Sequence, residues 1–361
     1  MAFIYKTGKN EKLKEKNLEM LDVLPDFCTQ YVIYMERSIS PSSLNTYLLR
    51  ISKFLEYLHA DNSYFGNKEI FDFKVSDMAN LTPDDINAFS HWIYNTNCNH
   101  RKSSNPNTTI SKSNKETTVD NYLSAINSLW NFFLTEKYVK YNPVASVKRS
   151  RQKQKEIIKL DPDEQAKFLD SLYCGEGFNE KQLMWNEKTR IRDIAMLMVL
   201  FGTGIRVSEL VGMDVDDLDF QNNCFKVLRK RDKIDVVYFG DEVKEALIDY
   251  LEERVPRYQP VDNETALFLV GIGKYKGTRL SVKSVQNIVK KFAKASLPLK
   301  GQSITPHKLR STYGTSLYRE TGDIYLVADV LGHKDVNTTK KHYAAQDDRK
   351  KREAANIVKI R

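Results

Sequence analysis

A basic segment without an apolar face interrupts this chain and limits how it can fold. From Asn142 to Lys155 the sequence reads NPVASVKRSRQKQK, with five cations in its last eight residues. Such a stretch buries little surface, so it is typical of a connection between compact bodies. The length of 361 residues also fits two domains. We therefore predict a first domain at residues 1–147, a basic linker at 148–160 and a second domain at 161–361.

The first part is predicted to be a helical domain, because its apolar residues recur at intervals of three and four. Ser40 before Pro41 and Thr82 before Pro83 have the pattern of capped helix starts. The stretch 96–118 is rich in Asn, Ser, Thr and Lys and lacks this period. We predict a polar inserted loop there, whose cations either contact phosphate or only face solvent.

The second part is predicted to be mixed. Two β-rich runs at 223–228 and 235–239 flank a basic turn, which indicates a hairpin with cations at its tip. Asp161 before Pro162 predicts another capped helix start. The expected fold class is thus mainly α with a small antiparallel β-sheet. Further helices are predicted at 192–200, 242–254, 283–294, 308–318 and 323–331.

Net charge and hydropathy indicate the kind of partner and the location that we expect for this protein. The formal net charge is +9, which favours a polyanionic partner such as nucleic acid. No apolar run approaches the roughly 18 residues of a membrane span, and the first residues lack the apolar core of a signal peptide, so we expect a cytoplasmic protein without a membrane partner. The four cysteines (Cys28, Cys98, Cys174 and Cys224) form no Cys-x-x-Cys pair, so we expect reduced thiols and no zinc ribbon.

Two short motifs in the second part place basic side chains at helix starts. In GTGIRVSEL, the glycines end one helix and Arg206 lies at the junction with the next. Arg206 either faces a ligand or forms a salt bridge with Glu209. In PHKLR, His307 and Arg310 are three residues apart, so they lie one turn apart on a helix. A histidine next to a guanidinium suits a phosphate, although such a pair is often only a helix cap.

A third motif follows near the end of the chain. In Val330-Leu-Gly-His333, Gly332 is expected to be the left-handed residue that ends a helix. Tyr343 comes ten residues after His333, among cations. Taken alone, such a tyrosine is more commonly a surface residue of an amphipathic helix.

Taken together, these motifs resemble the signature of the tyrosine recombinase (phage integrase) family. The signature has an Arg in Gly-x-Arg-x-Ser-Glu, a hairpin lysine, His-x-x-Arg, Leu-Gly-His and a downstream Tyr, and this chain has them in that order over about residues 160–345. The first part resembles the family's helical, SAM-like core-binding domain, and the second its mixed α+β catalytic domain. Xer-type and Gram-positive integrases are the most similar subfamilies. The chain departs from them at Ser311, where many relatives have His, and in the insert 96–118.

The resemblance implies a site-specific recombinase that cuts and rejoins DNA through a 3′-phosphotyrosine and a Holliday junction, without ATP, metal or another cofactor. Tyr343 would be the nucleophile, and Lys230 would protonate the leaving oxygen, with Lys233 as the second choice. The catalytic set implied is Arg206, Lys230, His307, Arg310, His333 and Tyr343. The residues expected to contact DNA are Lys148, Arg149, Arg151, Lys153, Arg229, Arg231 and Lys233.

The implied partner is double-stranded DNA with paired half-sites. Four protomers would assemble on two such sites from a protein that is monomeric in solution, and the C-terminal tail at 350–361 would dock on a neighbouring protomer. Two alternatives share some of these features: a type IB-like DNA topoisomerase and a non-catalytic DNA-binding protein. Chromosome-dimer resolution, integration or excision of a mobile element, and DNA inversion are equally compatible with the motifs.

Overall fold

The computed structural model describes residues 2–96, 114–150, 159–229, 233–333, 335 and 336. The chain divides into two compact units, and the division lies between Gln154 and Lys155, inside the segment predicted as the linker. We call residues 7–154 the N-terminal unit and residues 155–361 the C-terminal unit; residues 1–6 are grouped with the latter. Each unit is described by itself.

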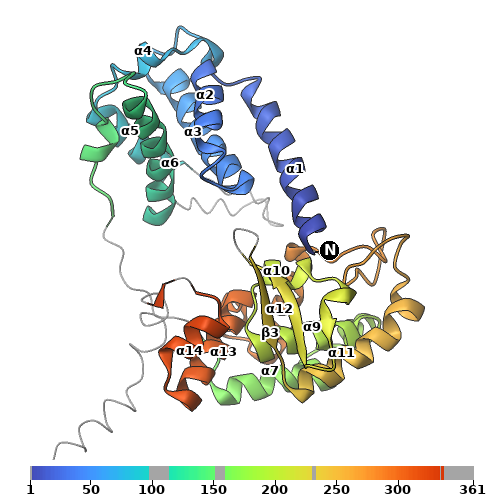
Figure 1. Cartoon of the computed structure of the whole chain (residues 1–361). Helices are drawn as coiled ribbons and strands as arrows, with labels where there is room; N and C mark the ends of the chain where they lie inside the picture. Colours follow the sequence, from blue (N-terminus) through green and yellow to red (C-terminus); the bar gives the residue numbers. More distant parts are fainter. Residues whose placement is uncertain (1, 97–113, 151–158, 230–232, 334, 337–361) are drawn as a thin grey trace, which may run out of the picture. The chain divides into compact units, whose positions relative to one another are not determined.

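The N-terminal unit is helical, as predicted (Figure 1). Ser40 Oγ accepts a hydrogen bond from the Ser43 amide at 3.2 Å, and Thr82 forms a capping box with Asp85. Both predicted caps are therefore confirmed. The helices are α1 (Ala2–Leu21), α2 (Asp26–Met35), α3 (Pro41–Asp61), α4 (Val75–Met78), α5 (Pro83–Asn95) and α6 (Glu116–Thr135), with short 3₁₀ turns η1 (Ile70–Asp72) and η2 (Pro143–Ser146).

Aromatic rings fill the core of this unit. Phe54 packs edge-on against Phe89 and Trp130, at centroid distances of 4.9 and 5.9 Å, and thereby joins α3 to α5 and α6. Trp130 is also edge-on to Phe133. The stretch predicted as a loop at 96–118 ends earlier than expected, because α6 begins at Glu116. The Asn114 side chain donates to the carbonyls of Ile93 and Thr96 and so attaches the start of α6 to the end of α5.

The C-terminal unit combines helices with a small sheet, which confirms the predicted fold class. Asp161 caps the first helix through a capping box with Glu164, as expected. The short helix α8 was not predicted from the sequence. The helices are α7 (Pro162–Cys174), α8 (Glu180–Glu187), α9 (Arg190–Thr203), α10 (Val207–Gly212), α11 (Asp241–Glu253), α12 (Val282–Ser296), α13 (Pro306–Thr321) and α14 (Ile324–Val330), with the shorter turns η3 (Val215–Asp217), η5 (Arg254–Tyr258) and η6 (Gly301–Ser303).

The sheet has three antiparallel strands in the order β1 (Leu218–Asp219), β2 (Cys224–Leu228) and β3 (Ile234–Tyr238). The predicted hairpin is β2–β3. Strand β1 was not predicted, because two residues are too few to form a recognisable alternating pattern. Leu228 pairs with Ile234 at the end of the ladder, and the Arg229 amide donates to the Lys233 carbonyl at 2.8 Å. The hairpin is therefore still hydrogen-bonded one residue beyond the assigned strands.

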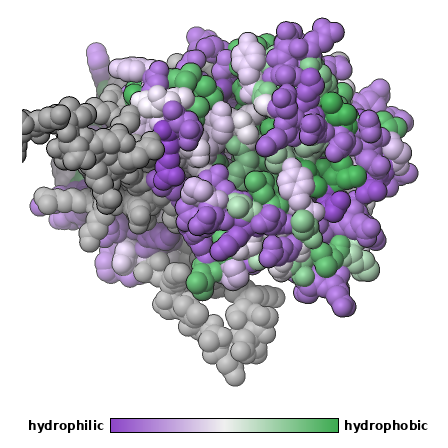
Figure 2. Space-filling view, turned by 90° about the horizontal axis from the view of Figure 1, so that it is seen from below, coloured by the Kyte–Doolittle hydropathy of each residue, from purple (hydrophilic) through white to green (hydrophobic). Residues whose placement is uncertain are grey.

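Side-chain exposure fits a protein whose apolar residues are mostly interior. One face of the molecule is largely hydrophilic, with hydrophobic side chains in small separate groups (Figure 2). Among the described residues, no helix combines the length and the apolar composition that crossing a membrane requires.

A buried ion-pair network joins α9 to α12. The Asp193 carboxylate is fully buried and accepts from Arg192 Nη2 at 2.6 Å and from Lys291 Nζ at 3.0 Å. Burial alone would raise the pKa of Asp193, but the charges of Arg192 and Lys291 outweigh it and hold this pKa below its usual range. The pair therefore stabilises the fold above the ordinary carboxyl pKa, and this stabilisation is lost as the pH falls through the lowered value.

We predict that Asp193→Ala destabilises the C-terminal unit by about 3–5 kcal/mol, because it leaves two cations without their buried partner. Calorimetric melting of the full chain measures the loss. Asp170→Ala, which removes an exposed carboxylate on α7, is the matched control and should change stability by less than about 0.5 kcal/mol. Equal shifts for the two variants would contradict the prediction.

Candidate active site

The junction between α9 and α10 fixes the first candidate residue. Gly204 ends α9 with φ +62°, and a Cβ atom there would lie 2.5 Å from Cδ1 of Tyr313, so the close turn requires glycine. Arg206 then caps α10: its amide donates to Glu209 Oε2 and its Nη1 to Glu209 Oε1, both at 2.8 Å. The salt bridge considered from the sequence is thus present, while 30% of the Arg206 side chain remains exposed.

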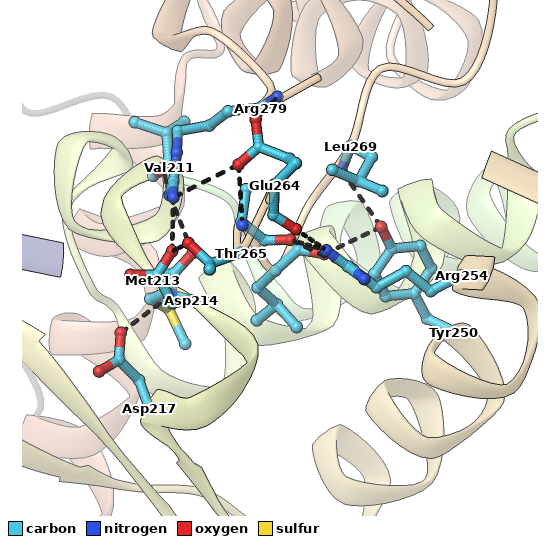
Figure 3. Close-up of polar contacts among 12 residues, drawn as sticks. Val211, Met213, Asp214, Asp217, Tyr250, Arg254, Glu264, Thr265, Leu269 and Arg279 are labelled. Atoms are coloured by element: carbon cyan, nitrogen blue, oxygen red, sulfur yellow. Dashed lines mark hydrogen bonds and ion pairs between the residues drawn. The ribbon is translucent and has the colours of Figure 1, made fainter. Parts of the chain in front are cut away.

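The other end of α10 is fixed by a buried polar network (Figure 3). Arg279 Nη1 donates to the carbonyls of Val211 and Met213, at 2.9 and 3.1 Å, where the helix ends. Its Nη2 forms an ion pair with the fully buried Asp214 at 2.5 Å. These bonds satisfy carbonyls that the short helix leaves without intrahelical partners. Because α10 is held at both ends, the direction in which Arg206 leaves the backbone is also fixed.

Helix α13 supplies the second pair of candidates. Pro306 is its first residue, His307 is exposed, and Arg310 is only 3% exposed. Arg310 Nη1 donates to the Gly204 carbonyl at 2.7 Å, so it connects α13 to the end of α9. Ser311 is buried, and its hydroxyl donates to the His307 carbonyl at 3.0 Å. Ser311 is the residue at which the chain departs from the family pattern, and its hydroxyl therefore bonds to the backbone of its own helix.

Helix α14 ends in a turn that positions His333. Gly332 has φ +60°, as predicted for a left-handed cap. The Gly332 amide donates to the Asp329 carbonyl and the His333 amide to the Ala328 carbonyl, at 2.7 and 2.8 Å. This pair of bonds is the Schellman motif, which closes a helix with a residue in the left-handed region. His333, which is half-buried, therefore leaves the helix in a defined direction.

Three arginines from separate elements meet at this turn. Arg229 donates to the carbonyls of Val330 and Leu331 at 3.2 and 2.9 Å. Arg310 also donates to the Leu331 carbonyl, and Arg206 donates to the Gly332 carbonyl at 3.2 Å. The structure thus brings together residues that lie more than 100 positions apart in the sequence.

The structure corrects the prediction that Arg229 contacts DNA. Its side chain is buried, with 7% of the residue exposed, and its Nε donates to Asp235 at 2.6 Å. Arg229 directly follows β2 and continues the alternation by which Phe225 and Val227 are buried. This period of two was a signal in the sequence, but the cluster of cations around Arg229 obscured it.

The remaining predicted residues fall into two groups. Lys148, Arg149 and Lys233 are exposed, and Arg149 Nη1 also donates to Ser124 Oγ on α6 at 2.7 Å. The predicted residues that lie outside the described ones are Arg151, Lys153, Lys230, Arg231 and Tyr343, together with most of the insert and the tail at 350–361.

Within the described part of the chain, no group of three or more His, Cys, Asp or Glu residues could hold a metal ion.

Comparison with known proteins agrees with the arrangement of these motifs. Residues 176–350 match the model of the phage integrase family. The chain is 30% identical over 354 residues to the tyrosine recombinase XerS of Streptococcus agalactiae, covering 92% of this chain and 95% of that protein. Its fold is similar to the Tn1549 transposon integrase in complex with circular intermediate DNA (TM-score 0.61, 19% identity, 91% of this chain and 99% of that one). It is also similar to a lambda integrase tetramer bound to a Holliday junction (TM-score 0.57, 16% identity, 88% and 76%).

Proposed function

Because this chain belongs to the tyrosine recombinase family and is a site-specific DNA recombinase, we propose that it cuts and rejoins DNA through a covalent bond to Tyr343. The phenol oxygen attacks the scissile phosphorus, a 3′-phosphotyrosine forms, and the 5′-oxygen leaves and takes up a proton. Attack by a 5′-hydroxyl on the phosphotyrosine reverses these bonds, so rejoining needs no ATP. The observation that carries the proposal is the meeting of Arg206, Arg310 and the His333 turn at one place.

Each of these residues has a defined chemical task in the proposal. A free tyrosine with a pKa near 10 is only about 0.1% ionised at neutral pH, so the site must lower the barrier in other ways. Arg206 and Arg310 bind the non-bridging oxygens and stabilise the charge of the transition state. His307 accepts the phenol proton, and His333 donates a hydrogen bond to the phosphoryl group. Lys230 protonates the leaving oxygen.

The bonds present without DNA fit this assignment. Arg206 and Arg310 donate to backbone carbonyls of Gly332, Gly204 and Leu331. A phosphate oxygen carries more negative charge than a carbonyl oxygen, so it is the stronger acceptor of the two. A scissile phosphate that enters next to the turn would compete for these N–H groups, and the arginines are already directed to the same place.

We further propose that four protomers act on two DNA sites, exchange strands through a Holliday junction and are monomers before binding. The similarity to the lambda integrase tetramer on a Holliday junction supports this assembly. The tail at 350–361 docks on a neighbouring protomer and links the tyrosines of successive subunits. The partner is duplex DNA with paired half-sites, and the place of action is the cytoplasm. The cations proposed to contact DNA are Lys148, Arg149, Arg151, Lys153, Arg231 and Lys233.

We predict that Tyr343→Phe binds its DNA site normally but forms no covalent adduct, since only the nucleophilic oxygen is lost. A nicked suicide substrate, which traps the adduct, measures this on a denaturing gel. Tyr325→Phe removes an exposed phenol on α14 and is the matched control, which should form the adduct at the normal rate. An adduct with the Tyr343 variant would disprove the assignment.

Lys230→Ala should be inactive on ordinary DNA and active on a substrate with sulfur at the 5′-bridging position, because a thiolate leaves without being protonated. Arg206→Ala should be inactive on both, since its task is to bind the non-bridging oxygens. The cleavage rates on the two substrates are the measurement. Rescue of Lys233→Ala instead would move the role of general acid to Lys233.

The combined change of Lys148, Arg149, Arg151 and Lys153 to Ala should weaken DNA binding and reduce its dependence on salt. Each lost phosphate contact lowers the slope of log affinity against log salt by about 0.9. Titrations at several salt concentrations in the Tyr343→Phe background measure binding without cleavage. An unchanged slope would show that these cations are only solvated.

Truncation after Arg352 should leave binding of one protomer to a half-site unchanged and weaken cooperative occupancy of paired half-sites, because the apolar residues Ile357, Val358 and Ile360 are lost from the neighbour's surface. Band-shift titrations on single and paired half-sites separate the two effects. A large fall in the melting temperature of the free monomer would show instead that the tail packs on its own chain.

A further inference from the structure

Arg229 lies beside the candidate active site but has no task in the reaction described so far. We propose that it is a positioning residue, which holds the turn Leu331–His333 in place and thereby orients the imidazole of His333 toward the scissile phosphate. The inference rests on the proposed function, since it assumes that His333 acts on the phosphoryl group.

The contacts of Arg229 join the end of α14 to β3, with two bonds to the turn and one to Asp235. Nε donates to Asp235 Oδ2 at 2.6 Å, Nη1 to the Leu331 carbonyl at 2.9 Å, and Nη2 to the Val330 carbonyl at 3.2 Å. A guanidinium is planar and presents its donors in a fixed fork, so these three bonds determine both the position and the orientation of the group. A lysine ammonium at this position lacks that geometry.

The backbone of Arg229 is anchored in the β2–β3 hairpin. Its amide continues the β2–β3 ladder by donating to the Lys233 carbonyl, and its carboxylate partner Asp235 stands on β3. The turn leaves room for the Arg229 guanidinium, because a Cβ atom on Gly332 would lie 2.3 Å from Nη1 of Arg229. Glycine at 332 is therefore needed twice, for its positive φ and for the space that the guanidinium occupies.

Arg229 differs from the other two arginines at the turn. Arg206 has 30% of its side chain exposed, and both it and Arg310 are proposed to bind the phosphate, in competition with their carbonyl bonds. Arg206 is also paired with a carboxylate, Glu209, whereas Arg229 is both buried and paired with Asp235, and lies 3.9 Å from Glu209. These carboxylates keep it where it is, so it retains the turn when DNA engages Arg206 and Arg310.

The test measures the rate of adduct formation on a nicked suicide substrate with saturating protein. Arg229→Lys keeps the positive charge for Asp235 and loses the fork, and it should slow cleavage by about 100-fold while the affinity for DNA stays unchanged. Arg229→Gln should behave likewise. Lys226→Gln removes an exposed cation from the same strand and is the control, with an unchanged rate.

A double-variant cycle distinguishes positioning from a general loss of structure. His333→Gln alone should slow cleavage, and adding Arg229→Lys to it should cost nothing more, because the group that Arg229 orients is already gone. If the two losses multiply, or if Arg229→Lys leaves the rate unchanged, the inference is wrong and the role of His333 stands. If His333→Gln itself has no effect, the proposed role of His333 fails, and the inference fails with it.

A substrate with sulfur at the 5′-bridging position provides a second discrimination. Arg229→Lys should remain slow on it, since His333 does not act on the leaving oxygen. Rescue would show that Arg229 acts through protonation of the leaving group, and it would overturn the inference. Arg229→Lys, which keeps the charge, decides the test if Arg229→Gln is found to fold poorly.

Discussion

The site depends on how the end of one short helix satisfies its carbonyl groups. Helix α14 ends at Val330, and its Schellman motif pairs the carbonyls of Ala328 and Asp329 but leaves those of Val330, Leu331 and Gly332 to other donors. Guanidinium groups of Arg206, Arg229 and Arg310 supply the donors. Each of these arginines belongs to a different element, so the bonds also hold α10, the β-hairpin and α13 around a common point. Three guanidinium groups are thereby gathered beside one turn by interactions that first of all complete a helix end.

In the proposed function, the same arginines serve both the folded protein and the reaction. Cations placed close together repel one another unless carboxylates or carbonyls lie between them. Glu209 lies within ion-pair distance of Arg206 and of Arg229, and the carbonyl of Leu331 accepts from both Arg229 and Arg310. The positive charge is therefore concentrated at one place while each arginine keeps a partner. A bound phosphate would take over some of these bonds without requiring a new arrangement of the backbone.

The cationic segments of the chain have different physical roles, although they look alike in the sequence. Lys148 and Arg149 are exposed near the end of the N-terminal unit, where they are available to a polyanion. Arg229 stands in an equally basic run, but it directly follows β2 and its side chain is buried. Arg192 and Lys291 meet a buried carboxylate and join two helices. Net charge thus indicates a partner, and only burial shows which cations can reach it.

The sequence by itself determined the features that depend on near neighbours. Caps at Ser40, Thr82 and Asp161, and the left-handed turn at Gly332, involve bonds to residues within about five positions, so local patterns predict them. The order of the motifs indicated the family, because such motifs are read directly from the sequence. Only the tertiary structure decided where the guanidiniums of Arg229 and Arg310 point. Their partners at Val330, Leu331 and Gly204 are, but for one, about 100 positions away, and packing of the whole unit brings them within reach.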